Sequence, residues 1–216
     1  MDQTDVTVAA VREVGTNALA IDFETPTGFD AQPGQFVRLS ALVGEEEVSR
    51  FYTVSSPEVG ETFEVTLTVD PEGEFGTYLA SLAPGDAVSL AGPFGDAHYE
   101  GEERTFVLAG GPGVGPAVAI AERTLDDGGD ATVVYRDDDP IHGERLAALA
   151  ERGVPVAILE GEESLDASLE EADDDGQVFV YGFAPFIDDA RDALDRAGYD
   201  VEAAKLESFG PEPGAE

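Results

Sequence analysis

The hydrophobic rhythm of the chain changes once, about halfway along, and this change constrains the fold more than any single motif does. From Thr4 to about Pro93, short segments alternate apolar and polar side chains and are separated by glycine, proline and acidic turns, a pattern typical of antiparallel strands. After Gly101, apolar strands alternate with amphipathic helical stretches, which indicates a doubly wound parallel sheet. The sequence therefore predicts two domains: an antiparallel β-barrel or sandwich over residues 1–100, and an α/β domain with a five-stranded parallel sheet over residues 101–216.

The expected elements follow from this rhythm. In the first domain, strands are expected around 6–11, 17–25, 34–41, 50–56, 62–70 and 86–92, with one helix within 76–86 that starts near Thr77 and ends before Pro84 and Gly85. In the second, strands are expected over 105–110, 131–136, 155–160, 177–182 and 201–208, helices over 114–126, 142–152, 165–172 and 185–197, and a short polar tail over 210–216. Because ligands of such sheets bind outside the carboxyl ends of the strands, chemistry is expected there.

The charge of the chain restricts its partners. There are 47 acidic and 11 cationic residues, a formal net charge of -36, and one lysine, Lys205. Such a field repels nucleic acid and anionic membranes. This spread of acid almost without lysine resembles proteins from salt-loaded cytoplasms, such as haloarchaeal ones. We interpret it as adaptation to high salt, where a screening length of about 3 Å at 1 M suppresses self-repulsion.

The residue types that are missing narrow the chemistry. Zero cysteines exclude disulfides, thiolate zinc sites and cysteine-ligated iron–sulfur clusters, so redox chemistry requires an organic cofactor. No apolar run approaches the ~20 residues of a membrane span, and the amino end "MDQTDVTV" has no secretory pattern. We expect a soluble cytoplasmic protein. No general acid–base pair is found, and His98 and His142 are expected to be ordinary surface residues.

Two motifs carry candidate chemistry. "LAGGPGVGP" at 108–116 follows a strand and opens a helix, so its backbone amides can cradle a pyrophosphate, although a glycine–proline turn after a strand is also common. In "SRFYTVSS" at 49–56, Arg50 can clamp a diphosphate in a forked geometry. Tyr52 can pack against a flat ring, and the hydroxyl of Thr53 can meet a ring nitrogen. Taken alone, this stretch also fits an edge strand with one solvated arginine.

The order of the motifs carries a resemblance. "PGQFV", "RFYTVSS", "GEFGTYL", "PGD", "GPFG", "LAGGPGVGP", "YGFAP" and a terminal "ESFG" follow one another over about residues 4–210. This ordered set resembles the ferredoxin-NADP reductase superfamily. The resemblance implies an FAD-binding Greek-key barrel followed by a nicotinamide-nucleotide domain, which agrees with the two rhythms.

The resemblance also implies roles for individual residues. Arg50 is similar to the FAD diphosphate ligand, Tyr52 to the residue against the isoalloxazine and ribityl chain, and Thr53 to the hydroxyl near flavin N5. Phe209 is similar to the terminal aromatic that covers the flavin and moves for the nicotinamide to stack. The further cofactor-binding candidates are Ser55, the helix-start residues Gly76 and Thr77, the loop glycines Gly110, Gly111 and Gly113, and Arg136 and Gly182.

Two departures from the family pattern concern hydride transfer. The family commonly has threonine where this chain has Pro112 and, near the nicotinamide, cysteine where it has Tyr181, so Tyr181 joins Tyr52, Thr53 and Phe209 as a catalytic candidate. For the choice of nucleotide, Arg136 suits the 2′-phosphate of NADPH, whereas the aspartates at 137–139 repel it and suit a ribose diol. We therefore lean towards NADH over NADPH.

The expected function is that of an FAD-dependent NAD(P)H oxidoreductase that passes single electrons to a separate carrier, with ferredoxin as the first candidate. A flavin reductase or the reductase component of an oxygenase is a second possibility. A non-catalytic FAD-binding electron-transfer or sensor subunit is a third. A nucleotide-binding protein without flavin would require "RFYT" to be accidental.

Overall fold

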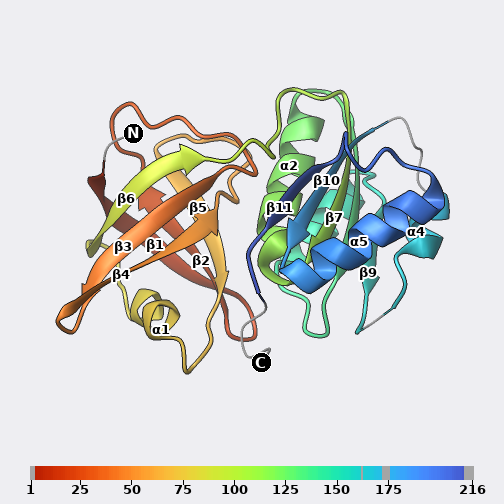
Figure 1. Cartoon of the computed structure of the whole chain (residues 1–216). Helices are drawn as coiled ribbons and strands as arrows, with labels where there is room; N and C mark the ends of the chain where they lie inside the picture. The colour runs from red at the N-terminus through yellow and green to blue at the C-terminus, as the bar shows by residue number, and fades with distance from the viewer. Residues whose placement is uncertain (1–2, 162, 172–175, 212–216) are drawn as a thin grey trace.

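The computed structural model describes residues 3–161, 163–171 and 176–211. Its first unit is an antiparallel barrel (Figure 1). Its sheet order is β4-β3-β6-β1-β2-β5. The strands are β1 (Thr4–Gly15), β2 (Ala18–Glu24), β3 (Phe36–Val43), β4 (Glu46–Thr53), β5 (Thr62–Thr68) and β6 (Ala87–Phe94). A bridge between Val54 and Val65 joins the end of β4 to β5, so the two outer strands of the order meet and the sheet closes.

The barrel core follows from the two-residue period of its strands. Val6 and Val8 on β1, and Ile21 and Phe23 on β2, point inward and are at most 2% exposed. The helix α1 (Glu74–Ala80) lies at one open end of the barrel (Figure 1). It buries two side chains, Phe75 and Leu79, in the same core.

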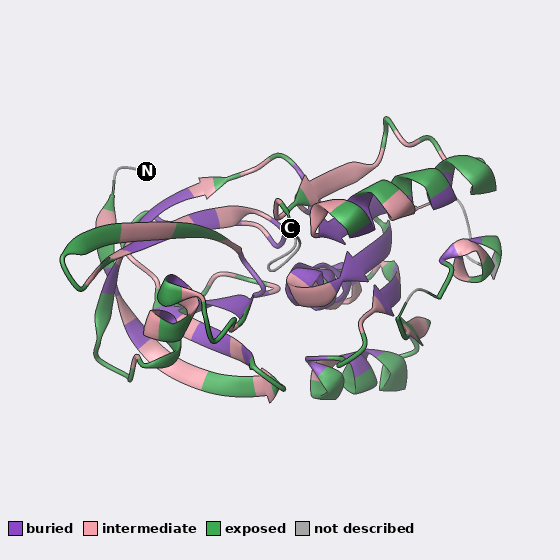
Figure 2. Cartoon of the chain, turned by 60° about the horizontal axis from the view of Figure 1, so that its bottom comes forward, coloured by how far each residue is buried: buried purple, intermediate pink, exposed green. Residues whose placement is uncertain are grey.

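The second unit is the predicted doubly wound sheet, with strand order β11-β10-β7-β8-β9 and all pairings parallel. Its strands are β7 (Arg104–Gly110), β8 (Asp130–Arg136), β9 (Val156–Leu159), β10 (Gln177–Gly182) and β11 (Lys205–Ser208). Its helices are η1 (Gly111–Gly113), α2 (Val114–Asp126), α3 (Gly143–Glu151), α4 (Asp166–Glu171) and α5 (Ala184–Ala197). Apolar residues of α2 and α3 pack on one face of the sheet and those of α4 and α5 on the other. Figure 2 shows buried residues on the sheet and exposed ones on the outer sides of these helices.

Several expected boundaries were wrong. α1 begins at Glu74 and ends at Ala80, earlier at both ends than expected, because the amides of Ser81 and Leu82 bond three residues back, to Tyr78 and Leu79, and close a turn. The last strand is limited to Lys205–Ser208, because backbone bonds to Asp200 form a turn just before it. Ala172, the expected end of one helix, and residues 212–216 of the expected tail lie outside the described residues.

The two units are in contact through the segment that links them and through α2. Lys205 of β11 donates to the backbone of His98 at 2.8 Å and to the carboxylates of Glu100 and Glu102 at 2.7 and 2.6 Å, so the one lysine holds the linking segment. α2 lies on the barrel side of the parallel sheet (Figure 1). No helix within the described ranges is long and apolar enough to cross a membrane.

Candidate functional site

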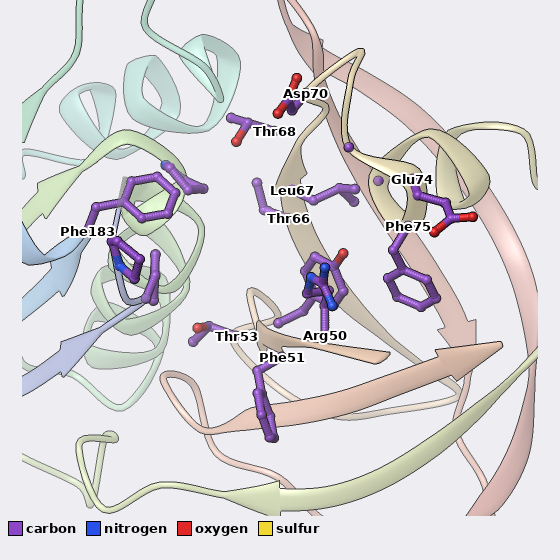
Figure 3. Close-up of a pocket in the computed structure, with 16 residues that line it drawn as sticks. Arg50, Phe51, Thr53, Thr66, Leu67, Thr68, Asp70, Glu74, Phe75 and Phe183 are labelled. Atoms are coloured by element: carbon purple, nitrogen blue, oxygen red, sulfur yellow. The ribbon is translucent and has the colours of Figure 1, made fainter. Parts of the chain in front are cut away.

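A pocket of about 390 Å³ lies where the two units meet (Figure 3). A second pocket, of about 820 Å³, lies at the carboxyl ends of the parallel strands. Thr68, Pro112 and Phe183 line both pockets, so the two are adjacent. The barrel supplies most of the residues that line the first pocket, and the second unit supplies Pro112, Phe183, Phe209 and Pro211. We call the first the barrel pocket and the second the sheet pocket.

The end of β4 brings three predicted residues into the barrel pocket. Arg50, Tyr52 and Thr53 all line it. Arg50 is exposed, and its Nη1 donates to the backbone oxygen of Ser49 at 2.8 Å. The Tyr52 ring stacks at 26° on the Phe75 ring of α1, with centroids 6.3 Å apart, and burial raises the pKa of its hydroxyl. Tyr52 therefore stays a neutral hydrogen-bonding group beside an aromatic wall.

The start of α1 contributes one of its two predicted residues. Gly76 is the third residue of the helix and lines the barrel pocket, and first-turn amides have no intrahelical acceptor. Thr77 does not contribute, because its amide and hydroxyl both donate to the Gly73 oxygen, at 3.1 and 2.8 Å. Asp70 and Glu74 also line the pocket, so Arg50 supplies positive charge beside two acids.

Ser55 does not reach either pocket. It lies beyond the end of β4 and is fully buried. Its hydroxyl accepts from Thr66 at 2.9 Å. The structure therefore places Ser55 outside the two pockets, although the sequence suggested it as a cofactor ligand.

The predicted glycines of the second unit divide into packing and pocket positions. A Cβ on Gly110 would lie 2.5 Å from the Phe186 ring, and one on Gly182 would lie 2.8 Å from it. A Cβ on Gly113 would overlap the Tyr181 carbonyl. Gly111 differs: its φ is +55°, and the nearest atoms to a Cβ are about 4 Å away. Gly110 and Gly111 both line the sheet pocket; Phe186 fills the space where a side chain on residue 110 would lie, whereas the corresponding space at residue 111 is open.

Arg136 lines the sheet pocket, but its guanidinium already donates hydrogen bonds to protein groups. Its Nη1 donates to Asp189 at 2.6 Å and to the Glu163 oxygen at 3.1 Å. Its guanidinium also lies 5.1 Å from the centre of the Phe186 ring. Asp137 and Asp138 line the same pocket, and the Tyr135 hydroxyl donates to Asp137 at 3.0 Å. The pocket is therefore acidic around an arginine that is already neutralised.

The two remaining catalytic candidates, Phe209 and Tyr181, lie in different parts of the structure. Phe209 lines the barrel pocket edge-on to Phe183, with ring centroids 6.0 Å apart and planes at 90°. Tyr181 is fully buried and lines neither pocket; its hydroxyl donates to the Ala97 oxygen. The structure therefore keeps Phe209 at the site and places the Tyr181 side chain in the contact between the units.

Some residues of the site gave no sequence signal. Thr66 of β5, Phe75 of α1 and Phe183, which lies between β10 and α5, line the barrel pocket. The expectation of a surface position for His142 was wrong, because it is 4% exposed and its Nε2 lies 2.7 Å from the Thr66 Oγ1. No cluster of three metal-ligating side chains occurs among the residues described.

The geometry fits two nucleotide ligands, one in each pocket. The barrel pocket offers a cation, a neutral phenol on an aromatic wall, a hydroxyl and a free helix-start amide, which suit a flavin with its diphosphate. The sheet pocket, with Gly111 at the carboxyl end of a parallel strand, suits a second nucleotide.

Comparison with known proteins supports this assignment. Residues 5–99 match the oxidoreductase FAD-binding domain family. The chain is 30% identical, over 92% of its length, to a stachydrine N-demethylase reductase subunit from Rhizobium meliloti. It is 27% identical, over 88% of its length, to a glycine betaine monooxygenase reductase subunit from Pseudomonas aeruginosa. The chain spans only 64% and 59% of the lengths of these two relatives.

Solved structures share the fold over nearly the whole chain. The FAD/NAD-binding domain of a nitric oxide dioxygenase from Vibrio cholerae has a TM-score of 0.84 at 22% identity, covering 96% of this chain and 98% of that one. A ferredoxin NADP+ reductase from Neisseria gonorrhoeae, solved with bound FAD and NADP, has a TM-score of 0.81 at 18% identity, covering 98% of this chain and 100% of that one.

Proposed function

Because residues 5–99 match the oxidoreductase FAD-binding domains and the whole chain has the ferredoxin-NADP reductase-like fold, we propose that this protein is an NAD(P)H-dependent flavoprotein reductase. Bound in the barrel pocket, FAD would supply the redox chemistry, which is acceptance of a hydride from NAD(P)H and release of single electrons to a separate carrier. The observation that carries the proposal is the barrel pocket, where Arg50, Tyr52 and Thr53 converge beside the carboxyl ends of the parallel strands. We place the division between the flavin and nucleotide domains near residue 100.

The chain's own residues bind and orient the two ring systems. Arg50 compensates the diphosphate charge, with the Gly76 amide as a second donor. Tyr52 would pack against the flavin ring, and Thr53 would offer its hydroxyl to a ring nitrogen. Phe209 covers the pocket from the nucleotide side and excludes water until the nicotinamide displaces it.

The sheet pocket favours NADH over NADPH. Arg136, the cation that suits a 2′-phosphate, already donates to Asp189, and Asp137 and Asp138 add negative charge. A ribose diol donates hydrogen bonds to such carboxylates, whereas a phosphate is repelled.

A separate protein receives the electrons in this proposal. The relatives named above are reductase subunits of an N-demethylase and of a monooxygenase, which favours an oxygenase component as the acceptor; ferredoxin is the other candidate. In a halophilic cytoplasm, which the charge of -36 suits, the acceptor is acidic too. Short-range contact then replaces electrostatic steering, so the electron-transfer rate should barely fall when salt is added. A steep loss of rate, with the reductase still folded, would contradict this.

The test is the visible absorbance of the purified protein in high salt, before and after anaerobic addition of NADH or NADPH. A flavin spectrum that bleaches supports the reductase. An unchanged flavin spectrum indicates a non-catalytic subunit, and a protein that takes up no FAD rejects the proposal.

A matched pair of variants tests the site itself. Arg50→Ala should lose FAD on desalting because the diphosphate charge is left poorly compensated. Arg196→Ala removes an exposed arginine paired with Asp166 in the second unit and should retain FAD. Full flavin retention by Arg50→Ala would overturn the assignment of the pocket.

A further inference from the structure

Two side chains of β5 reach across the contact between the units. Glu64 and Thr66 are 7% and 6% exposed and, two residues apart on a strand, share a face. Their partners lie at the start of α3: Arg145 Nη1 is 2.9 Å from Glu64 Oε1, and His142 Nε2 is 2.7 Å from Thr66 Oγ1. His142 and Arg145 are three residues apart, so they project from the same side of one helical turn.

His142 is itself held in place. It caps α3 with a φ of +56°, and its amide donates to the Val14 oxygen of β1 at 2.7 Å. Burial, and to a smaller extent two neighbouring guanidinium groups, lowers the pKa of its ring to about 3, so the ring is neutral. The Thr66 hydroxyl donates to Ser55 at 2.9 Å, which leaves its oxygen to accept a hydrogen from His142 Nε2.

Arg145 belongs to a branched network that joins four elements. Its Nε and Nη2 donate to Glu122 of α2 at 2.9 and 2.7 Å. The other oxygen of Glu64 accepts from Arg12 of β1 at 2.5 Å. The Glu64, Glu122 and Arg145 side chains are 9%, 18% and 20% exposed. Ion pairs with so little exposure add little net stability, and their best-supported effect is to specify one geometry.

This network lies directly behind the pocket. Thr66 lines the barrel pocket, and a Cβ on Gly115, at the start of α2, would lie 2.8 Å from the Thr66 side chain. Pro112, three residues before Gly115, lines both pockets. A shift of α2 and α3 along β5 would therefore change the distance between the two pocket walls. Reacting atoms must come within about 3–3.5 Å, and an error of about 1 Å can cost about 100-fold in rate.

We propose that His142 and Arg145 are positioning residues, which hold the nucleotide wall of the site at the distance from the flavin wall that hydride transfer needs. They act through Thr66 and Glu64 and contact neither the nicotinamide nucleotide nor the flavin. The inference rests on the proposed reductase function.

The experiment measures geometry and rate separately. The chain has no cysteine, so Ala80→Cys on α1 and Ala197→Cys on α5, both exposed, place one spin label in each unit. The distance distribution between the labels is compared in the otherwise unaltered protein, Arg145→Met and a control, Arg152→Met. Arg152 also lies at α3, but it pairs with Asp126 within the second unit, where both side chains are about half exposed.

Arg145→Met should broaden or shift the distance distribution and slow flavin reduction at saturating NADH about 10- to 100-fold. FAD content should stay unchanged and the Kd for NADH should stay within about threefold, since no ligand contact is removed. Arg145→Lys should restore part of the rate, and Arg152→Met should behave like the unaltered protein. His142→Phe should act in the same direction as Arg145→Met and serves as the second test if that variant does not fold.

Two results would overturn the inference: a distance distribution identical to that of the unaltered protein, or a broadened distribution with an unaltered reduction rate. If neither nucleotide reduces the flavin of the unaltered protein, the proposed function fails. The distance distributions then decide by themselves whether these residues hold the two units together.

Discussion

The phenolic oxygen of Tyr181 lies 2.5 Å from the carbonyl oxygen of Ala97, so β10, an inner strand of the parallel sheet, holds the segment that leads out of the barrel. Full burial raises the pKa of this hydroxyl, which stays a donor at every working pH. Its role is therefore in the contact between the units.

Tyr181→Phe should lower the free energy of unfolding by about 1–3 kcal/mol, because the buried carbonyl of Ala97 loses its donor. Denaturant unfolding in high salt measures this loss. The rate of flavin reduction at saturating NADH should change less than threefold. A large loss of rate with unchanged stability would instead return Tyr181 to the catalytic machinery.

Asp189→Asn should release Arg136 and raise the preference for NADPH relative to NADH about tenfold in kcat/KM, equivalent to about 1.4 kcal/mol. The physical reason is that the guanidinium, now 2.6 Å from Asp189, becomes available to a 2′-phosphate. Asp192→Asn makes the same charge change on α5, outside the residues that line the sheet pocket, and should leave the ratio unchanged. Equal ratios in both variants would argue against Arg136 as the determinant.

His142 should make the protein acid-labile in a defined range. Its folded-state pKa, about 3, lies below the ordinary value near 6.5, so the unfolded chain binds one more proton between these limits. The stability present above pH 6.5 is therefore lost as the pH falls towards 3, with a slope of up to about 1.4 kcal/mol per pH unit.

The comparison for His142 is His142→Gln, which keeps a donor for Thr66 but cannot titrate. Its unfolding free energy should fall less steeply between pH 6 and about pH 4 than that of the unaltered protein. Carboxylate titration is common to both proteins, so the difference in slope isolates the ring. Parallel pH profiles would show that the ring is protonated in the folded state.

Phe209→Ala should tighten binding of the oxidised nucleotide about three- to tenfold, because the nicotinamide no longer has to displace an aromatic pair worth about 0.5–1.5 kcal/mol. Phe209→Tyr keeps the ring and should keep the affinity. Difference spectra of the flavin on nucleotide titration measure both. Weaker binding in Phe209→Ala would mean that the ring supports the nucleotide and does not compete with it.

The parts of this structure that were predictable from sequence are those set by local periodicity. The buried strand around Val107 and the helix that starts at Val114 were recognisable because their apolar spacing reflects packing on one sheet. Arg50, Tyr52 and Thr53 were placed together because they share one strand end. Local sequence is enough for such features.

The errors concern contacts between residues far apart in sequence. The partner of His142, Thr66, is 76 residues away, and the partner of Arg136, Asp189, is 53 residues away. Neither contact leaves a recognisable pattern in the local sequence. Gly110 was predicted to bind phosphate, but the Phe186 ring occupies the space where a side chain on residue 110 would lie.

The closure of the first sheet has a consequence for how the molecule avoids self-association. The Val54–Val65 bridge pairs the outer strands of the barrel at one position, and the second sheet ends on β9 and β11, each of four residues. Short or paired edges offer little template for a neighbouring chain. High salt screens the repulsion between acidic surfaces, so under such conditions edge geometry, more than charge, keeps one copy of this protein from adding its strands to another.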